Sequence, residues 1–283
     1  MKIVYVDGEF LPWNKAVIPV DDLAVIRGYA VCDIMSTFRG TPYFLDEHIQ
    51  RLMDSAVKIG ITLPWQAADI KKIVSQVLDK NPDLSEANIR IIITGGSSPD
   101  FFTPSRAPRL IVLVTDIPGL PEEWYSRGVK VITHYEERAN PEAKVTDYVP
   151  AAMALKKAKK AGATEAIYIS SDNLAMEATT SNLFAFIGNT LVTPATGVLK
   201  GITRKAVLGL AKDMFAVEER PLPLSELLSA REVFITGTNK GVVPVVQIDD
   251  TVIGKGKPGG KTKALIEALD SHANAFSSGN NKG

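Results

Sequence analysis

The sequence contains little cysteine and little histidine, and neither sign of charge is in excess. Cys32 is the single cysteine among 283 residues, so no disulfide can form within the chain, which favours a reducing compartment. The three histidines lack the spacing of a metal site, and we therefore expect no metal. Lys plus Arg and Asp plus Glu are equal at 32 each, which argues against a strongly basic nucleic-acid-binding face.

Long hydrophobic runs are also missing. No apolar segment approaches the roughly 20 residues that a membrane-spanning helix needs. The first residues, MKIVYVDGEF, lack the basic start and apolar stretch of a signal peptide. We therefore expect a cytoplasmic protein with neither nucleic acid nor a membrane as a partner.

The sequence does contain alternating strand and helix patterns, which predict an α+β protein of two domains. Turns at Asp7-Gly8 and Arg39-Gly40 indicate two hairpins. Asp46 and Asp147 are the expected N-caps of two helices. Helices are expected over 46–59, 66–80, 147–161 and 203–214 and from about 261, and strands over 88–94, 109–115, 129–134, 165–170, 183–193, 232–237 and 242–248.

The segment 118–128 contains two prolines and two glycines and is interpreted as the connector between the domains. This places a small N-terminal domain at 1–117 and a larger one at 129–270. The tail 271–283 is polar, and we expect it to be disordered.

Two residues are candidates for cofactor chemistry. Lys144, in NPEAKVTDYVPAA, lies between a strand and a helix, where a partly desolvated amine can form an imine with an aldehyde cofactor. Glu177, in LAMEATTSNLFAF, is flanked by apolar residues, and a buried acid there needs a positive partner or a proton. A solvated lysine and a loop-facing carboxylate are the alternative interpretations.

Two further segments suit a phosphate group. In LKGITRKAVLGLAKDM, a helix begins after Gly201 and exposes the backbone N–H groups of Ile202 and Thr203, as in helix N-termini that bind phosphate. FITGTNKG ends a strand with Thr236, Gly237 and Thr238 and predicts a second phosphate-binding turn. An ordinary helix start and a tight strand exit remain the alternatives.

Together these segments resemble the fold type IV (class IV) pyridoxal-phosphate enzymes, which include branched-chain aminotransferases, D-amino-acid aminotransferases and aminodeoxychorismate lyases. The resemblance covers nearly the whole chain, from RGYAVCD and FLDEHIQRL through ATTSN, GITR and TGT to QIDDTVIG. It implies a larger C-terminal domain with mixed sheets and a β-barrel-like core. It also implies pyridoxal 5'-phosphate as the cofactor, with the pyridoxamine form in the half-reaction, and a homodimer.

The resemblance implies a role for each matching residue. Lys144 matches the lysine that forms the Schiff base and later moves the proton, and Glu177 matches the acid at the pyridine nitrogen. The other matches are Arg51, Ile202, Thr203 and Thr238 on the phosphate, Leu199 against the ring face, and Tyr148 on the phenolic oxygen.

The substrate site departs from the pattern of many D-amino-acid aminotransferases. They carry an Arg-x-His pair in the loop where this chain has SPDFFTP, with Asp100 and Phe102 in the corresponding places. Arg27, with Tyr29, and Arg90 are the candidate residues for binding the substrate carboxylate. As alternatives, Arg90 could face solvent and Arg27 could form a structural ion pair with a nearby acid. The acids in question are Asp21, Asp22 and Asp33.

The RGY-x-x-x-D element and the GGSSPD loop resemble the D-amino-acid branch of the family more than the branched-chain one. This similarity predicts transamination between D-alanine or D-glutamate and pyruvate or 2-oxoglutarate, with some side activity on amines of R configuration. An L-branched-chain aminotransferase, an aminodeoxychorismate lyase and an inactive binding homologue remain open as alternatives.

Overall fold

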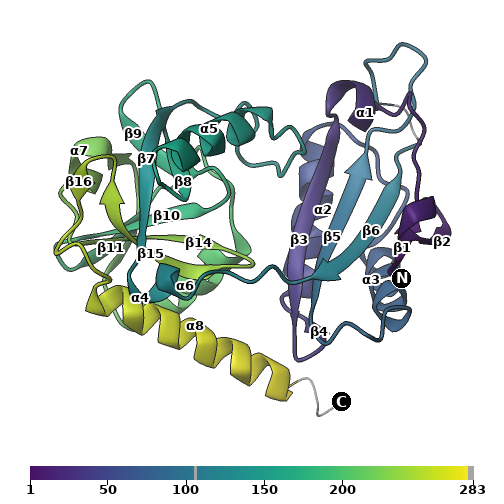
Figure 1. The fold of residues 1–283 in the computed structure, drawn as a ribbon. Coiled ribbons are helices and arrows are strands. Elements are labelled where there is room, and N and C mark those ends of the chain that lie inside the picture. Colours follow the sequence, from purple (N-terminus) through teal and green to yellow (C-terminus); the bar gives the residue numbers. More distant parts are fainter. Residues whose placement is uncertain (105–106, 280–283) are drawn as a thin grey trace. The chain divides into compact units, whose positions relative to one another are not determined.

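The structure, a computed structural model, describes residues 1–104 and 107–279 and divides into two units (Figure 1). Unit 1 comprises Met1–Pro118 and Ala143–Asp147, and unit 2 comprises Gly119–Glu142 and the residues from Tyr148 onward. The boundary after Pro118 falls at the start of the predicted connector, but the rest of that connector belongs to unit 2. The segment Ala143–Asp147, which includes Lys144, groups with unit 1.

Unit 1 is built on a six-stranded sheet with the order β2-β1-β6-β5-β3-β4, in which every neighbouring pair is antiparallel. Its strands are β1 (Ile3–Val6), β2 (Glu9–Pro12), β3 (Ala30–Phe38), β4 (Thr41–Pro42), β5 (Ala87–Thr94) and β6 (Leu110–Asp116). Its helices are the 3-10 helix η1 (Trp13–Lys15), α1 (Leu23–Arg27), α2 (Leu45–Lys58) and α3 (Ala67–Asp79).

Both predicted hairpins are present in this sheet. The turns between β1 and β2 and between β3 and β4 consist of Asp7-Gly8 and Arg39-Gly40, and all four residues have positive φ. Two-residue hairpin turns require this conformation, because it follows the twist of the flanking strands. The strong turn signal therefore placed both hairpins correctly.

The main core of unit 1 lies on one face of its sheet, and a smaller cluster around Val4 and Val6 of β1 lies on the other. Ile89, Ile91 and Ile93 of β5 are fully buried in one hydrophobic cluster with Ile49 and Leu52 of α2. Side chains alternate between the faces of a strand, so Arg90 lies on the opposite face from these isoleucines.

Two predicted N-caps differ from the structure. Helix α2 is preceded by Phe44 in the left-handed conformation, and Asp46 lies in its first turn. The N-cap of α5 (Val149–Lys160) is Tyr148, so Asp147 stands one residue too early. Acidic residues near a helix N-terminus stabilise the helix through its dipole as well as by capping, so their presence fixes the helix start only within a few residues.

Unit 2 is built on a ten-stranded mixed sheet. Its helices, besides α5, are α4 (Glu123–Ser126), α6 (Ile202–Lys212), α7 (Leu224–Leu228) and α8 (Gly260–Gly279). Its strands are β7 (Val129–Tyr135), β8 (Glu165–Ile169), β9 (Leu174–Ala178), β10 (Asn182–Ile187), β11 (Thr190–Thr193), β12 (Val217–Glu219), β13 (Leu222–Pro223), β14 (Glu232–Gly237), β15 (Gly241–Ile248) and β16 (Thr251–Val252).

This sheet confirms the predicted mixed, barrel-like core. Strand β7 runs parallel to β8 and β15, and the other pairings are antiparallel except that of β11 with β12. The sheet curls, and buried residues from β7, β8, β10, β14 and β15 form one cluster: Val131, Ile167, Leu183, Val233 and Val243. A separate cluster forms where α6 and α8 pack on β10 and β14.

Two further predictions for unit 2 were wrong. The strand expected over 183–193 is two strands, because Gly188 takes a positive φ and turns the chain between β10 and β11. The tail expected to be disordered from 271 is helical as far as Gly279, where α8 ends. No proline or glycine precedes Gly279 in that stretch, so the helix continues although its side chains are polar; residues 280–283 lie outside the described part.

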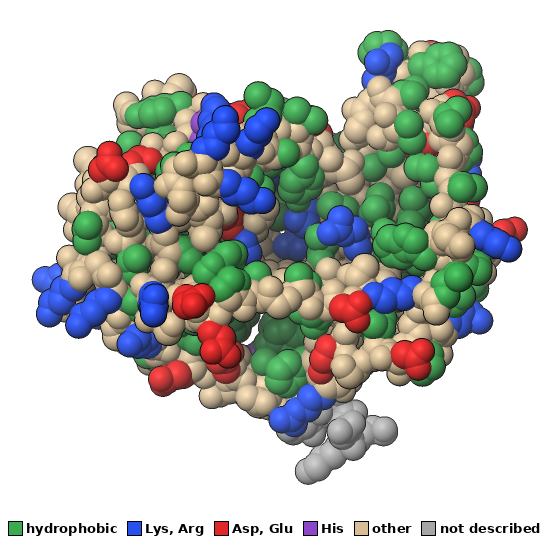
Figure 2. Space-filling view, in the orientation of Figure 1, with side chains coloured by type: hydrophobic (Ala, Val, Ile, Leu, Met, Phe, Trp, Pro, Cys, Tyr) green, Lys and Arg blue, Asp and Glu red, His purple; other side chains and the backbone are tan. Residues whose placement is uncertain are grey.

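Charged side chains of both signs are interspersed on the face shown in Figure 2, in keeping with their equal numbers. No helix among the described residues is long and apolar enough to cross a membrane.

Candidate active site

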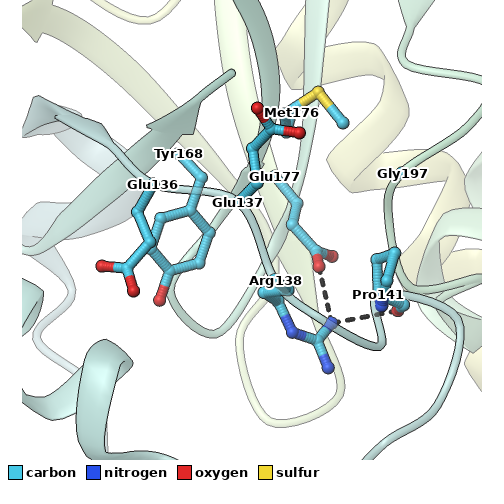
Figure 3. A pocket seen from close by; sticks show the side chains of 8 residues that line it. All are labelled: Glu136, Glu137, Arg138, Pro141, Tyr168, Met176, Glu177 and Gly197. Atoms are coloured by element: carbon cyan, nitrogen blue, oxygen red, sulfur yellow. Dashed lines mark hydrogen bonds and ion pairs between the residues drawn. The ribbon is translucent and has the colours of Figure 1, made fainter. Parts of the chain in front are cut away.

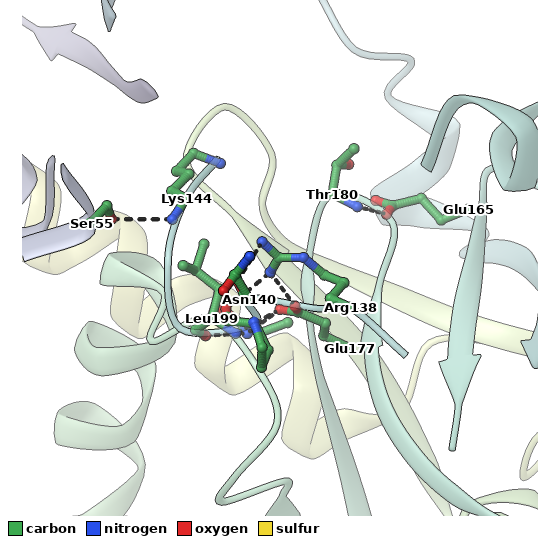
Figure 4. A network of polar contacts seen from close by, with 10 residues as sticks. Ser55, Arg138, Asn140, Lys144, Glu165, Glu177, Thr180 and Leu199 are labelled. Carbon is green, nitrogen blue, oxygen red and sulfur yellow. Dashed lines mark hydrogen bonds and ion pairs between the residues drawn. The ribbon is translucent and has the colours of Figure 1, made fainter. Parts of the chain in front are cut away.

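The segment that carries Lys144 is held against the start of β3 in unit 1. The carbonyl oxygen of Lys144 accepts a hydrogen bond from the backbone N–H of Cys32 at 2.9 Å. Its own N–H donates to the Ser55 hydroxyl at 3.1 Å (Figure 4), and Val145 bridges to Val31. Both backbone groups of Lys144 are therefore fixed, and its half-buried side chain extends from a rigid base.

Arg51 does not stand alone on α2, because its guanidinium binds the buried Asp33 of β3. Nε and Nη2 donate to the two carboxylate oxygens at 2.8 and 2.7 Å, which is the bidentate geometry of a strong pair. His48 lies one turn before Arg51, and its Nδ1 is 2.7 Å from the same carboxylate. Arg51 is therefore oriented by Asp33, and Nη1 is the part of its fork that makes no hydrogen bond to a described residue.

Burial and charge shift the protonation of this cluster. Burial alone would raise the pKa of Asp33, but Arg51 and His48 outweigh it and hold that pKa well below its usual range. Burial lowers the pKa of His48 despite the opposing attraction of Asp33. The cluster therefore holds an ionised Asp33 and disfavours a charged His48.

Arg27 lies at the end of α1 and packs on the loop that follows β5. Its Nε donates to the carbonyl oxygen of Phe101 at 3.0 Å, and its guanidinium lies over the Phe102 ring, 4.1 Å from the centroid. The ion pair with Asp21, Asp22 or Asp33 that was the alternative for Arg27 is not formed among the described residues. Nε and one face of the guanidinium are thus occupied, while the two Nη groups make no hydrogen bond to the described part of the chain.

Asp100 organises the loop beneath Arg27. Its carboxylate accepts hydrogen bonds from the Ser98 hydroxyl, the Phe102 N–H, and both the N–H and the hydroxyl of Thr103. The Thr103 donors, with the others, hold the pKa of Asp100 well below its usual range. This acid therefore serves as an internal cap of the loop.

The other two carboxylate candidates differ in their surroundings. Arg90 is exposed on β5, on the sheet face opposite α2 and α3, where it pairs in register with Ile34 of β3. The Tyr29 hydroxyl donates to the carbonyl oxygen of Ile59, and its ring packs against the core of unit 1. These contacts hold Tyr29 against unit 1 and do not test its predicted contact with the substrate.

In unit 2, Glu177 is a buried acid on β9 whose two carboxylate oxygens both accept hydrogen bonds. Nη1 of Arg138 donates to Oε1 at 2.7 Å (Figure 3), and the Leu199 N–H and the Asn182 amide donate to Oε2 at 3.0 and 3.3 Å. Only 5% of Glu177 is exposed, so it fits the prediction of a buried acid with a positive partner. It does not fit the alternative of a loop-facing carboxylate.

The Arg138–Glu177 pair forms part of the wall of a small pocket in unit 2. Figure 3 shows the lining residues, which are Glu136, Glu137, Arg138, Pro141, Tyr168, Met176, Glu177 and Gly197. Burial raises the pKa of Tyr168 to about 12, so its hydroxyl is neutral at physiological pH. Gly197 lies against the Met176 methyl group, and its φ of +70° is a left-handed conformation that favours glycine.

The predicted phosphate donors of unit 2 occupy a helix start and a turn. Helix α6 begins after Gly201, which has no side chain to cap the N–H groups of Ile202 and Thr203. A Cβ at Gly201 would lie 2.0 Å from Oδ1 of Asn182, so the close approach of these two residues requires glycine. Thr238 is half-buried in the turn between β14 and β15.

These features suit a phosphorylated pyridine cofactor. The first-turn N–H groups of a helix and a hydroxyl on a neighbouring turn are donors for a phosphate. The Thr236 hydroxyl, at the end of β14, is buried without a hydrogen-bond partner in the described structure. The buried carboxylate of Glu177 is an acceptor for a protonated ring nitrogen, so the donor set and the acid fit the cofactor expected from the sequence.

Leu199 and Tyr148 have the following positions. Leu199 is half-buried, and its N–H donates to Glu177 (Figure 4). Its carbonyl oxygen accepts a hydrogen bond from the Asn182 amide at 2.7 Å, so the backbone of Leu199 joins these two residues. Tyr148 precedes α5, and 38% of it is exposed. Neither position tests the predicted contacts with the cofactor ring.

Several residues that shape the site were not identified from the sequence. Arg138 lies in the strand exit HYEERANP, and Asn182 lies in the ATTSN segment that was recognised without a role for the asparagine. Asp33 and His48 were not assigned as partners of Arg51. The spacing of His48 and Arg51, three residues apart on one helix, indicated a shared face and hence a shared partner.

Comparisons with known proteins agree with this geometry. A family model described as "Amino-transferase class IV" matches residues 30–248. The chain is 33% identical to a "Putative branched-chain-amino-acid aminotransferase" of Methanocaldococcus jannaschii, over 93% of this chain and 94% of that protein. It is also 33% identical to a "D-alanine aminotransferase" of Bacillus licheniformis, over 95% of this chain and 96% of that protein.

Solved structures show the same fold. The structure of a branched-chain amino acid aminotransferase from Escherichia coli superposes with a TM-score of 0.89 at 26% identity, covering 95% of this chain and 94% of that one. The T.th. branched-chain amino acid aminotransferase with pyridoxamine 5'-phosphate has a TM-score of 0.88 at 27% identity, covering 96% of this chain and 94% of that one.

Proposed function

Because the chain belongs to the class IV aminotransferase family, we propose that it transfers the amino group of a D-amino acid, of the D-alanine or D-glutamate type, to a 2-oxoacid such as pyruvate or 2-oxoglutarate. Enzymes of this family use pyridoxal 5'-phosphate. When bound, this cofactor supplies an aldehyde that condenses with amines and a ring that accepts electrons from the substrate Cα. The observation that carries the proposal is the buried Glu177 carboxylate, which Arg138, Asn182 and the Leu199 N–H hold as an acid for the ring nitrogen.

Glu177 and Arg138 together set the charge at the ring nitrogen. A carboxylate that is ionised in a buried position favours a protonated nitrogen beside it. Arg138 keeps Glu177 oriented and offsets part of its charge. Ile202, Thr203 and Thr238 would hold the phosphate, with Leu199 against the ring, Tyr148 at the phenolic oxygen and Arg51 as a further cation for the phosphate.

Lys144 is the residue that we assign to covalent and proton-transfer chemistry. Its amine would bind the cofactor aldehyde in the resting enzyme and, once displaced by the substrate amine, move the proton at the substrate Cα. The fixed backbone on both sides of Lys144 limits the positions that the amine can reach. Proton transfer benefits from this limitation because it requires a short and well-directed contact.

Arg27 and Arg90 are the proposed carboxylate-binding residues. Arg27 supports this role through its surroundings, since the Phe102 ring and the Phe101 carbonyl orient a guanidinium whose two Nη groups form a fork for a carboxylate. Asp100 and Phe102 replace the Arg-x-His pair of related D-amino-acid enzymes, and here both residues build the support of Arg27. The arginine on α1 would thus take over the task of the missing loop arginine.

The preference for D-amino acids is supported by the RGY-x-x-x-D element. Its aspartate, Asp33, is fully buried and forms the ion pair with Arg51, so the element has a defined structural purpose. The similarity to a D-alanine aminotransferase points the same way. An L-branched-chain aminotransferase is the second candidate, favoured by relatives and solved structures that carry that name.

A substrate assay separates the two candidates. Purified holoenzyme is mixed with 2-oxoglutarate and either D-alanine or L-leucine, and amino transfer is followed through the 2-oxoacid formed. We expect D-alanine to be turned over at least about tenfold faster than L-leucine, a difference in barrier of about 1.4 kcal/mol. Faster turnover of L-leucine or L-isoleucine would contradict the D-amino-acid assignment and support the second candidate.

We also propose that the protein is a homodimer, by resemblance to its family. Sedimentation or light scattering should give about twice the chain mass of 30.6 kDa. A mass equal to that of one chain would contradict this assembly.

A further inference from the structure

One buried charge of unit 2 has no task in the proposed chemistry. Lys240 lies in the turn between β14 and β15, its side chain is only 16% exposed, and its Nζ forms an ion pair with Glu165 of β8. Glu165 is 4% exposed in its side chain. Burial alone would raise the pKa of Glu165, but Lys240 and neighbouring donors outweigh it and lower that pKa. The pair is therefore a buried, charged link.

Glu165 fixes the turn that joins β9 to β10. Its carboxylate accepts hydrogen bonds from the Thr179 hydroxyl at 3.0 Å, the Thr180 N–H at 2.7 Å (Figure 4) and the Ser181 hydroxyl at 2.6 Å. This turn begins just after Glu177 and ends at Asn182. Glu165 thus holds the short segment whose two ends provide the acid for the ring nitrogen and its amide partner.

Lys240 ties a second turn to the first. Its Nζ donates to the hydroxyls of Thr180 and Ser181, both at 2.9 Å. Its N–H donates to the Gly237 carbonyl oxygen at 3.1 Å, which closes the turn that contains Thr238. The aliphatic part of Lys240 also lies over Gly237, where an added Cβ would be 3.2 Å from its Cγ.

We propose that Lys240 and Glu165 are positioning residues that lock the turn of Thr238 to the turn between Glu177 and Asn182, so that both present their donors to the cofactor phosphate and ring at once. This inference rests on the proposed assignment of Thr238 and Glu177 to the cofactor. Neither Lys240 nor Glu165 contacts the cofactor in this arrangement. A lysine buried against one acid and two hydroxyls has all three ammonium protons engaged, which makes the link directional as well as charged.

The alternative is an ordinary buried ion pair. Its loss would lower the stability of the fold and would weaken the binding of both forms of the cofactor equally. The two cases differ in what they do to the phosphate. Without Lys240, Glu165 still holds the turn between Glu177 and Asn182 through its own hydrogen bonds, so the Thr238 turn is the one released. Its displacement weakens binding of a phosphorylated cofactor much more than binding of the dephosphorylated vitamer. A general loss of order weakens both.

The test is a titration of apoprotein with pyridoxal 5'-phosphate and, separately, with pyridoxal, followed by absorbance. Lys240→Met should raise the dissociation constant of pyridoxal 5'-phosphate about tenfold, as expected for a lost network of charge-assisted hydrogen bonds, and change that of pyridoxal less than about twofold. Lys240→Arg, which keeps the charge, should recover part of the affinity. Arg220→Met removes an ion pair with Glu226 in the same unit and is the matched control, expected to change neither constant.

A gentler variant keeps the test valid if Lys240→Met does not fold. Thr180 is exposed, and Thr180→Val removes only one hydroxyl from the network. It should raise the constant for pyridoxal 5'-phosphate about threefold without affecting pyridoxal. Equal changes for both vitamers, or none in either variant, would overturn this inference, whereas failure of the wild-type protein to bind pyridoxal 5'-phosphate would overturn the proposed function instead.

Discussion

Glu177 shows how one side chain acquires a chemical role from its neighbours. An isolated buried carboxylate would take up a proton, because burial disfavours its charge. Arg138, Asn182 and the Leu199 N–H instead stabilise the charged form. Removing Arg138 would therefore disfavour the charged form of Glu177 first, and would thereby weaken the interaction of Glu177 with any group that it binds.

Arg27 provides the sharpest test of substrate recognition by a single residue. We expect Arg27→Ala to raise the KM for D-alanine about tenfold and to leave kcat within about twofold, since one charge-assisted contact to a carboxylate contributes about 1.5–3 kcal/mol. Steady-state kinetics with D-alanine as the variable substrate give both constants. Arg39→Ala, at an exposed turn of the same unit, is the control and should leave both unchanged.

Phe102→Leu distinguishes the orienting support from the charge itself. This variant removes the ring beneath the Arg27 guanidinium and leaves the arginine in place. A smaller rise in KM than for Arg27→Ala is expected. An unchanged KM in Arg27→Ala would mean that this arginine has only a structural part and would leave Arg90 as the carboxylate-binding residue.

Among the secondary-structure elements, β3 and α2 are joined through a polar cluster within an otherwise apolar core. Asp33 comes from the strand, and His48 and Arg51 come from the helix, one turn apart. Such a cluster fixes the register of the helix on the strand, because only one alignment satisfies all three side chains. It also makes the packing of the two elements sensitive to pH.

His48 gives this sensitivity a predictable sign. Its pKa in the folded protein is lowered by burial, so as the pH falls through about 6.5 the unfolded chain takes up a proton before the folded one does. Stability is therefore lost as the pH falls through that range. We expect the midpoint of thermal unfolding to drop more between about pH 7.5 and 5.5 in the wild type than in His48→Gln, which cannot titrate.

The wild type and His48→Gln also provide the control for this pH effect. Between about pH 7.5 and 8.5 histidines carry almost no charge, and both proteins should respond alike. If the midpoint of thermal unfolding fell equally in both proteins at acidic pH, His48 would not be the titrating group.

Sequence patterns predicted these elements well where the signal was local. The Asp7-Gly8 and Arg39-Gly40 turns placed two hairpins, because positive φ at both turn residues suits few sequences. The helix start after Gly201 was placed within one residue. By contrast, β9 was not predicted as a strand, and Gly188 was not recognised as a turn between two strands. Five residues with one acid, LAMEA, give too short a pattern to separate strand from loop.

At the scale of the whole molecule, the sequence indicated which segments matter but not all of their partners. Lys144 and Glu177 were identified from their flanking residues and from the order of segments along the chain. The contact of Arg27 with Phe101 and Phe102, and that of Arg138 with Glu177, join residues 74–75 and 39 positions apart. Tertiary contacts of this kind follow from the folded backbone, so one sequence does not reveal them.

Cofactor binding should stabilise the protein to an extent that depends on Lys144. A ligand that binds only the folded form adds about 2.7 kcal/mol when its concentration is 100 times its dissociation constant. Pyridoxal 5'-phosphate is therefore expected to raise the midpoint of thermal unfolding of the apoprotein. The rise should be smaller for Lys144→Ala, which keeps the proposed phosphate donors of unit 2 but lacks the amine that we propose binds the aldehyde.

Pyridoxamine 5'-phosphate separates the contribution of Lys144 from that of the phosphate donors. It has no aldehyde, so it should raise the midpoint by the same amount in the wild type and in Lys144→Ala. Differential scanning fluorimetry of the two apoproteins with each vitamer supplies the four values needed. If pyridoxal 5'-phosphate stabilised both proteins equally, Lys144 would not be the residue that binds the aldehyde, and another amine of the chain would have to be sought by reductive trapping and peptide mapping.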